Sequence, residues 1–408
     1  MIAALDPGFA QGAGGPVRSA DDWAAWFWAE FLPGWLARVH DDQGGMFDTL
    51  AADGTPMLAA EKTVLAQARI LFTLSHLALL SGNPALVAAA EHQAAFLPRF
   101  RKAPGLYRRA LRRDGSVTGL AGDEVARSYD QSFVLLALAT WNRLSPREET
   151  AAEIEMCWEA LATRLTDPAT GLLLEDDTLT DPAAPKAPLR AQNPHMHLYE
   201  ACLQAFEMSH DDLWQTRAAS LRALGLKHFL DTETGSIAEF RAPDLGPLPG
   251  PDGLRREPGH QCEWAWLLGR EAELGGDPAL RGTAATLMAF ADRHGFAGAG
   301  PLQGAAFDAV TASGAVMEHS FLLWPQTEAI KALALRHRAS EAAAGDRARA
   351  LLCLMFERWF AGRKTFVNRL DAGGESLWSE APSRLIYHLV LALTEGARAG
   401  LWPGLPRH

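Results

Sequence analysis

The amino-acid sequence predicts an all-α protein, an (α/α)6 barrel of six helical hairpins with small hairpin loops at its mouth. Three observations support this fold. Nearly every long segment has apolar residues three and four positions apart, and the alternation typical of strands is scarce. The helical segments recur with a period of about 65 residues. One helix of each repeat carries aromatic and ionisable residues near its N-terminal end, which favours a closed ring over an open solenoid.

The first helix of each hairpin has the spacing of an amphipathic helix, as in EKTVLAQARILFTLSHLALL. Six such segments follow one another, at 61–80, 127–141, 195–209, 260–274, 318–336 and 382–397. A second helical stretch follows each of the first five, at 84–100, 149–165, 212–229, 278–294 and 345–361. The opening segment 21–39 supplies the sixth outer helix, and its tryptophans are expected in the core. We therefore expect a single barrel domain over residues 1–408.

The loops between the helices combine small residues with short apolar patches. The segments 41–56, 101–117 and 167–179 have this character, which predicts turns and small hairpins at the barrel mouth. The segment 241–258 is the richest in proline and glycine, and we interpret it as a lid or a tether.

The overall composition excludes several classes of partner. A formal net charge of −11 and a pI of about 5.6 argue against nucleic acid and anionic membranes. The sequence has no run of about 18 uninterrupted apolar residues, so we expect no membrane span. Residues 1–15 lack the basic start of a signal peptide. The four cysteines show no CxxC spacing, which is typical of a reduced protein, so we expect a cytoplasmic location. The sequence leaves the oligomeric state open, a homo-oligomer included.

Ionisable residues recur at matching positions in successive repeats. Glu200 follows His197 by three residues, and Glu263 follows His260 by three. A spacing of three places each pair on one face of a helix, and both pairs should face the same central cavity. The other repeats supply further candidates at comparable positions: Arg69, Tyr129, Asp130, Trp324, Glu328 and His388.

The stretch NPHMHLYEA (193–201) contains two histidines that cannot share one role, because residues two apart on a helix point to nearly opposite sides. Asn193 is expected to cap the helix, and Pro194 suits its first turn. The repeat register predicts that His197 faces the cavity. His195 is then expected to brace the loop or the helix start.

These residue types favour acid/base chemistry on a sugar. A histidine has an unperturbed pKa of about 6.5, so two histidines on opposite sides of a substrate can remove a proton and return it. The face of Trp324 suits the C–H surface of a sugar, whereas Arg69 and Asn193 suit its hydroxyl groups. The chain has no HExxH or CxxC motif and no GxSxG elbow, and the glycine-rich stretch 8–15 does not follow a strand. We therefore expect no metal and no cofactor.

Five stretches resemble the N-acylglucosamine 2-epimerase family, and in particular its aldose–ketose isomerase branch of mannose isomerase type. They are YDQSF (129–133), NPHMHLYEA (193–201), GHQCEWAWLL (259–268), WPQTEAI (324–330) and YHL (387–389). The resemblance implies a barrel that moves a proton between C1 and C2 of a free sugar, or inverts C2, without metal. It implies that His197 helps to open the sugar ring and that His260 and His388 are the acid/base pair. It also implies substrate binding by Arg69, Tyr129, Asn193, Glu263, Trp324 and Glu328.

From this resemblance we expect a cofactor-free isomerase that interconverts D-mannose and D-fructose through a cis-enediol, with a monosaccharide as its partner. Reprotonation on the other face of C2 would instead give a 2-epimerase of mannose/glucose or cellobiose type. Relatives often carry a tryptophan where this chain has Leu65, and Arg384 would suit a phosphate- or sulfonate-bearing sugar. Outside this class stand a glycoside hydrolase that uses Asp130 and Glu263, about 5–10 Å apart, and a non-catalytic carbohydrate-binding protein.

Overall fold

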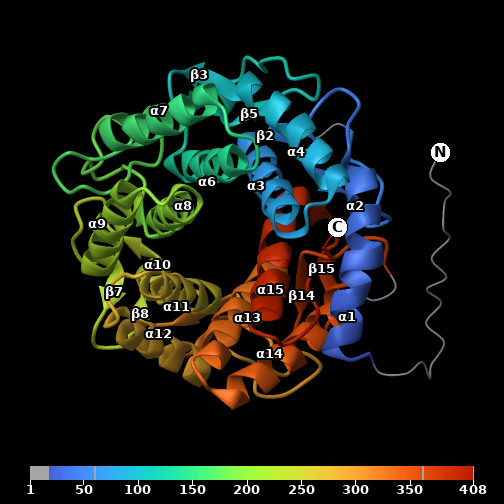
Figure 1. Ribbon diagram of the computed structural model, residues 1–408. Helices are drawn as coiled ribbons and strands as arrows, with labels where there is room; N and C mark the ends of the chain where they lie inside the picture. Colours follow the sequence, from blue (N-terminus) through green and yellow to red (C-terminus); the bar gives the residue numbers. More distant parts are fainter. Residues whose placement is uncertain (1–17, 59–60, 361–362, 408) are drawn as a thin grey trace.

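Two concentric rings of helices make up the computed structural model, which describes residues 18–58, 61–360 and 363–407 (Figure 1). The inner ring consists of α3 (Val64–Ser81), α6 (Ser128–Leu144), α8 (Asn193–Ser209), α11 (Pro258–Glu273), α13 (Leu323–Arg338) and α15 (Ile386–Arg398). The outer ring contains α4 (Pro84–Phe96), α7 (Glu148–Arg164), α9 (Asp212–Phe229), α12 (Leu280–His294) and α14 (Ala342–Met355). The opening helices α1 (Ala20–Trp26) and α2 (Leu32–Val39), joined by a π-helical turn, complete it. This arrangement confirms the predicted (α/α)6 barrel. The stretches 1–15 and 8–15 discussed above lie outside the described residues.

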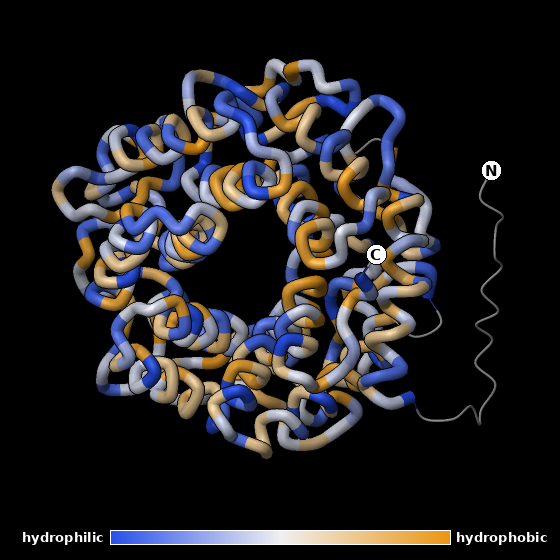
Figure 2. Tube along the Cα trace, viewed as in Figure 1, coloured by the Kyte–Doolittle hydropathy of each residue, from blue (hydrophilic) through white to orange (hydrophobic). Residues whose placement is uncertain are grey.

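The two rings differ in how their helices are buried. In α9 the buried residues form one stripe at spacings of three and four: Trp214, Ala218, Leu221, Gly225 and Phe229. In α11 every residue from Pro258 to Glu271 is buried, because outer helices cover one side and the other inner helices the rest. Apolar residues accordingly concentrate where the rings face each other (Figure 2).

The inner helix α3 is long and apolar enough to cross a membrane, with a mean hydropathy of 1.5 over its 18 residues. However, 78% of that window is buried inside the protein, where α3 packs between α6 and α15. The helix has the length and composition of a membrane span because it is a buried core helix of the barrel.

Short antiparallel strands occupy the loops at the mouth, as the sequence predicts. Four two-stranded pairs lie within single repeats or between neighbouring ones: β2 (Lys62–Thr63) with β5 (Ala110–Leu111), β3 (Arg101–Ala103) with β4 (Leu106–Tyr107), β6 (Arg190–Ala191) with β9 (Phe240–Arg241), and β7 (Leu230–Asp231) with β8 (Ser236–Ile237). Two sheets have three strands: β10 (Arg255–Arg256), β11 (Ala309–Thr311) and β12 (Val316–Glu318), then β13 (Ser320–Leu322), β14 (Arg369–Asp371) and β15 (Ser376–Trp378).

The C-terminal part of the proline- and glycine-rich segment 241–258 is held to the rest of the protein by secondary structure and ion pairs. It contains the short helix α10 (Pro251–Leu254) and the strand β10. Arg255 donates to Glu318 at 2.6 Å, and Arg256 donates to Asp231 at 3.0 Å. These contacts favour the tether interpretation over the lid.

Three helix starts differ from the sequence prediction. Residues 320–322 form β13 rather than the start of α13, because their backbone pairs with β14. Residues 382–385 likewise belong to β16 (Ala381–Pro382) and a 3-10 turn before α15. Asn193 is the first residue of α8, and its side chain makes no capping hydrogen bond. In each case the tertiary environment overrides a local preference.

The ring is closed by contacts between the first loop and the last repeat. The strand β1 (Thr49–Leu50) pairs with β16. Ser383 donates from its backbone N to the Asp48 carbonyl at 2.7 Å and from Oγ to the Phe47 carbonyl at 2.6 Å. The Asp48 carboxylate in turn accepts from the Gln67 amide on α3 at 2.8 Å. This junction fixes the start of α15 against α3.

Trp23, Trp28 and Trp35 of the opening helices lie in the core, as predicted, whereas Trp26 is partly buried against it. Trp35 is fully buried, and the ring of Trp23 stacks on Phe356 with centroids 5.3 Å apart. Trp28 donates from Nε1 to the carbonyl of Pro403 at 3.3 Å. The opening helices therefore pack against the end of α14 and the C-terminal segment.

The packing of α15 against Trp402 yields a stability prediction. A Cβ added at the helical Gly396 would overlap the Trp402 ring, so Gly396→Ala should destabilise the fold by about 1–3 kcal/mol. The control is Gly282→Ala on α12, where a Cβ meets no atom within 4 Å, and this variant should be up to about 1 kcal/mol more stable. Denaturant unfolding measures both. An equal gain in stability for the two variants would contradict the packing at Gly396.

Candidate active site

The first two turns of all six inner helices bring the predicted residues together at the mouth of the barrel (Figure 1). Three histidines, three carboxylates and one arginine of this group are nearly or fully buried: Arg69, His197, Glu200, His260, Glu263, Glu328 and His388. Tyr129, Asn193 and Trp324 are partly exposed around them. Because little water reaches the buried groups, the neighbours of each one decide its charge.

His388 is held as a neutral imidazole between a carboxylate and a guanidinium. Its Nδ1 lies 2.8 Å from Glu328 Oε1, and its Nε2 lies 3.3 Å from Arg69 Nη1. An arginine can only donate hydrogen bonds, so Nε2 is the acceptor. The ring proton is therefore on Nδ1, which donates a hydrogen bond to Glu328. Burial, together with the charges of Arg69 and Lys331, lowers the pKa of His388 well below its ordinary value. At neutral pH this histidine therefore has an unprotonated Nε2.

His260 has the opposite environment. Its Nδ1 lies 2.8 Å from Glu239 Oε2 and 3.2 Å from Glu257 Oε2. Burial alone would lower the pKa of His260, but the charges of Glu239 and Glu257 outweigh it and raise the pKa to about 10. The ring lies 4.7 Å from the ring of Trp324, whose other neighbour is His388 at 6.1 Å. His260 is thus an imidazolium at neutral pH.

Glu239 depends on two more side chains for its position. Gln192 donates from Nε2 to Glu239 at 3.0 Å, and its Oε1 accepts from Trp264 Nε1 at 2.6 Å. Glu239 lies in the turn between β8 and β9, far in sequence from His260. The sequence carries no periodic signal at Glu239, Glu257 or Gln192, so the prediction missed all three.

His197 faces the cavity, as the repeat register predicts. Its Nδ1 lies 3.0 Å from Glu200 Oε2, and its ring contacts those of Tyr129 and Phe133. Burial lowers the pKa of His197 to about 4, so it is neutral. Glu200 stays ionised: burial raises its pKa, but the contact with His197 and the Tyr387 hydroxyl bring it to about 2.

Glu200 and Glu263 occupy matching positions in their repeats but differ in their contacts. Glu263 does not pair with His260, and neither of its carboxyl oxygens has a hydrogen-bond partner among the described residues. Burial and the nearby Glu328 raise the pKa of Glu263 well above its ordinary value. This shift favours the protonated carboxyl, which can donate a hydrogen bond. The physical reason for the difference is that the loop residues Glu239 and Glu257 reach His260 first.

The two remaining residues of NPHMHLYEA have distinct places. His195 Nε2 accepts from the backbone N of Leu173 at 2.9 Å, which shows that this histidine braces the preceding loop. The Asn193 Oδ1 is buried and has no hydrogen-bond partner in the described part of the chain. Asn193 is therefore open to a ligand in the cavity rather than engaged as a cap.

Asp130 and Arg384 lie at the rim of the same cavity. Burial raises the pKa of Asp130 to about 6. Arg384, in the 3-10 turn one helical turn before His388, makes no ion pair or hydrogen bond with the residues that the structure describes. Burial and the neighbouring Arg69 guanidinium lower the pKa of Arg384.

Three groups of histidines and carboxylates are close enough to hold a cation, but apart from Glu263, which belongs to two of them, their members are paired within the protein. His197 binds Glu200, and His260 binds Glu239 and Glu257. The third group, Glu263, Glu328 and His388, already contains the ammonium of Lys331 at 2.5 Å from Glu328 Oε2. We therefore identify no metal ligands among the described residues.

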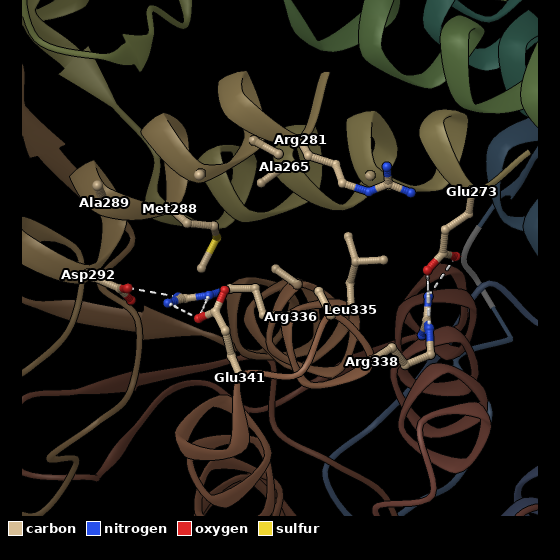
Figure 3. Close-up of a pocket in the computed structure, with 15 residues that line it drawn as sticks. Ala265, Glu273, Arg281, Met288, Ala289, Asp292, Leu335, Arg336, Arg338 and Glu341 are labelled. Atoms are coloured by element: carbon tan, nitrogen blue, oxygen red, sulfur yellow. Dashed lines mark hydrogen bonds and ion pairs between the residues drawn. The ribbon is translucent and has the colours of Figure 1, made fainter. Parts of the chain in front are cut away.

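A pocket of about 340 Å³ lies outside this site, between the C-terminal halves of α11 and α13 and the outer helix α12 (Figure 3). Its floor is made of alanines and Met288. The charged side chains at its rim pair with one another, as in Arg336 with Asp292 and Glu341, and Arg338 with Glu273. The pocket contains no group suited to acid/base chemistry on a sugar, so the mouth of the barrel is the candidate active site.

Comparisons with known proteins identify the family of the chain and agree with the fold. The family model described as N-acylglucosamine 2-epimerase matches residues 45–392. A mannose-6-phosphate isomerase of Rhizobium meliloti is 30% identical over 388 residues, which cover 92% of this chain and 96% of that protein. A D-mannose isomerase of Marinomonas mediterranea is 27% identical over 56% of this chain and 59% of its own length.

Solved structures share the fold at low sequence identity. A crystal structure of D-mannose isomerase superposes with a TM-score of 0.80 at 19% identity, covering 94% of this chain and 100% of that one. A cellobiose 2-epimerase from Spirochaeta thermophila also gives 0.80, at 22% identity, over 93% of this chain and 96% of that one. The match of the family model over most of the sequence shows that the chain is a sugar isomerase or epimerase and belongs to the N-acylglucosamine 2-epimerase family.

Proposed function

We propose that this enzyme interconverts an aldose and its ketose, D-mannose and D-fructose, by proton transfer between C1 and C2 without a metal ion. One observation carries the proposal: the rings of His260 and His388 both lie near Trp324, at 4.7 and 6.1 Å between centroids, and their partners hold them in opposite protonation states. A pair of titratable groups whose pKa values are driven apart is what general acid/base catalysis needs.

The chemistry can be assigned to atoms. The neutral Nε2 of His388 removes the C2 proton of the open-chain aldose, and the electrons of the C2–H bond form the C1=C2 double bond. The imidazolium of His260 gives its proton to O1, which yields a cis-enediol. His388 then returns its proton to C1, and the neutral His260 accepts the O2 proton, which forms the ketose and restores both histidines. Arg69, beside His388, stabilises negative charge on the enediolate oxygen.

The surrounding residues suit binding of the open chain. Asn193 offers an unpaired acceptor, and the protonated Glu263 offers a donor. Trp324 presents its face to C–H bonds, and Tyr129 is held by a hydrogen bond of 2.8 Å from Arg69. His197, fixed by Glu200, is placed to act on the ring oxygen during ring opening. Glu328 acts indirectly, because its carboxylate is committed to His388.

The alternatives differ in their support. Reprotonation of C2 on its other face would turn the same residues to 2-epimerisation, as in the cellobiose 2-epimerases of the same fold. The family assignment argues against the glycoside hydrolase with Asp130 and Glu263, and against a non-catalytic binding protein. We also infer a cytoplasmic location, which the free and mostly buried cysteines support.

An anionic sugar is the second candidate substrate. Arg384 places an uncommitted guanidinium next to Arg69 and one turn from His388. Asp48 and Asp130 are near enough to affect its pKa, but neither forms an ion pair with it in the described chain. A relative named mannose-6-phosphate isomerase matches nearly the full length. These observations support recognition of a phosphate at the far end of the sugar.

If His260 and His388 are the acid/base pair, the product should take up deuterium from the solvent, and loss of either histidine should abolish most turnover. With D-mannose in deuterated water and EDTA, NMR should show fructose that carries deuterium. His260→Ala and His388→Ala should each reduce turnover by at least about 100-fold with the fold intact. The control His210→Asn, at the exposed end of α8, should retain full activity. Loss of activity on chelation would contradict the metal-free reaction, and substantial activity in either alanine variant would refute its role.

The carboxylates around His260 predict that its ring titrates at high pH. In ¹⁵N-histidine NMR spectra of the wild type, the His260 ring should keep both protons through neutral pH and lose one near pH 10. Glu239→Gln removes the largest opposing charge, so the pKa of His260 should fall by about one unit or more. Glu271→Gln is the control, because Glu271 lies on the same helix but contacts Tyr199 and Arg222. An unchanged His260 titration in Glu239→Gln would refute the assignment.

Arg384 predicts substrate discrimination. If the substrate is phosphorylated, kcat/KM for mannose 6-phosphate exceeds that for mannose, and Arg384→Met lowers the former by about 10-fold or more. The value for mannose should change little. Arg281→Met, in the pocket of Figure 3, removes an arginine remote from the site and serves as the control. An equal effect of Arg384→Met on both sugars would exclude phosphate recognition by this residue.

A further inference from the structure

A lysine lies fully buried inside the barrel, one turn below the proposed catalytic residues. Lys331 Nζ on α13 is 2.5 Å from Glu328 Oε2 and 3.8 Å from Glu263 Oε1. It also lies 3.9 Å from the centroid of the Trp266 ring. Burying an ammonium is costly unless it is paired, so an apolar side chain would suit this position better if packing were its only role.

The ammonium is one end of a chain of contacts that passes through the proposed base. One oxygen of Glu328 faces Lys331, and the other accepts from His388 Nδ1 at 2.8 Å. His388 Nε2 then meets Arg69 at 3.3 Å. Glu328 is thus the only carboxylate among the described residues that contacts both a lysine and the ring of His388.

We propose that Lys331 is a positioning residue, which favours the ionised form of Glu328 as the acceptor of the His388 Nδ1–H and so leaves Nε2 unprotonated to act as the base. This proposal rests on the isomerase function proposed above. Lys331 does not touch the sugar in this scheme. It acts through Glu328, which sets the tautomer and the orientation of the imidazole.

The charges around the site explain why a cation is needed. Three carboxyl groups, Glu200, Glu263 and Glu328, meet at this depth, and Lys331 is the lysine among them. The titratable and charged groups that surround His388 come from every neighbouring element: Arg69, Tyr129, His197, Glu200, Glu263, Glu328, Lys331, Arg384 and Tyr387. Loss of the ammonium favours uptake of one more proton by this group, either on Glu328 or on His388.

An extra proton at either position prevents His388 Nε2 from acting as the base. A proton on His388 occupies Nε2. A proton on Glu328 converts the acceptor of the Nδ1 hydrogen into a potential donor, which favours the tautomer with hydrogen on Nε2. In either case the active form exists only at higher pH than in the wild type. A role in packing alone would change stability without moving this pH dependence.

The test compares Lys331→Met with Lys331→Arg in the full chain. In Lys331→Met, kcat with D-mannose should fall by about 10- to 100-fold with little change in KM, a part of the usual general-base contribution. The acidic limb of its pH profile should move up by about one pH unit or more. Lys331→Arg keeps the charge, so its acidic limb should stay in place. If Lys331→Met does not fold, Lys331→Gln replaces it with the same readouts.

The matched control is Lys62→Met, because Lys62 is also buried and paired, with Asp41 at 2.9 Å, but lies outside the site. This variant should keep the wild-type pH profile even where its stability falls. The ¹⁵N shifts of the His388 ring, assigned by comparison with His388→Asn, report the tautomer without turnover. Wild type should show hydrogen on Nδ1, and Lys331→Met should show Nε2 protonated at neutral pH.

These readouts separate failure of this proposal from failure of the proposed function. If no sugar is isomerised but the tautomer changes as described, the isomerase assignment fails and the role of Lys331 stands. An unchanged tautomer in a folded Lys331→Met variant overturns the role of Lys331. An activity loss without movement of the acidic limb also overturns it, and leaves the isomerase assignment intact.

Discussion

The contact between Arg69 and His388 joins the first inner helix to the last, across 319 residues of sequence. It exists only because the ring of helices closes, and closure rests on the bonds of Ser383 to the first loop. With the ring closed, six helix ends share one axis, and each can place one or two side chains in the same small volume. The site is therefore a property of the whole chain, and no single repeat contains it.

Closure also determines the electrostatics. The ring removes water from most of the ionisable groups at its centre, so each charge depends on its immediate neighbours. His260 meets two carboxylates and keeps its proton, whereas His388 meets Arg69 and the Lys331 charge and loses it. Two residues of the same type thereby acquire the complementary roles that an enediol reaction requires. The raised pKa of Glu263 follows from the same rule, since the Lys331 ammonium lies 2.5 Å from Glu328 but 3.8 Å from Glu263.

The sequence predicts the fold well because the barrel is built from long helices with clear periodicity. It also predicts that His197, His260 and His388 meet, since the repeat places them at matching helix positions. It fails where function depends on loops or on tertiary pairing. Glu239, which holds His260, lies in a tight turn with no periodic signal. Lys331 looks like an ordinary helical lysine until its neighbours on α11 and α15 are known. Asn193 has the residue type of a cap, but its side chain makes no capping hydrogen bond.

The most direct measurement of the central claim is the pH dependence of kcat/KM for conversion of D-mannose to D-fructose, which reports the free enzyme's acid and base. The opposed environments of His388 and His260 predict a broad plateau. Activity should persist below pH 6.5, because the pKa of His388 is depressed, and should fall only near pH 10, where His260 loses its proton. A narrow bell with limbs near pH 6.5, the ordinary pKa of histidine, would contradict the account.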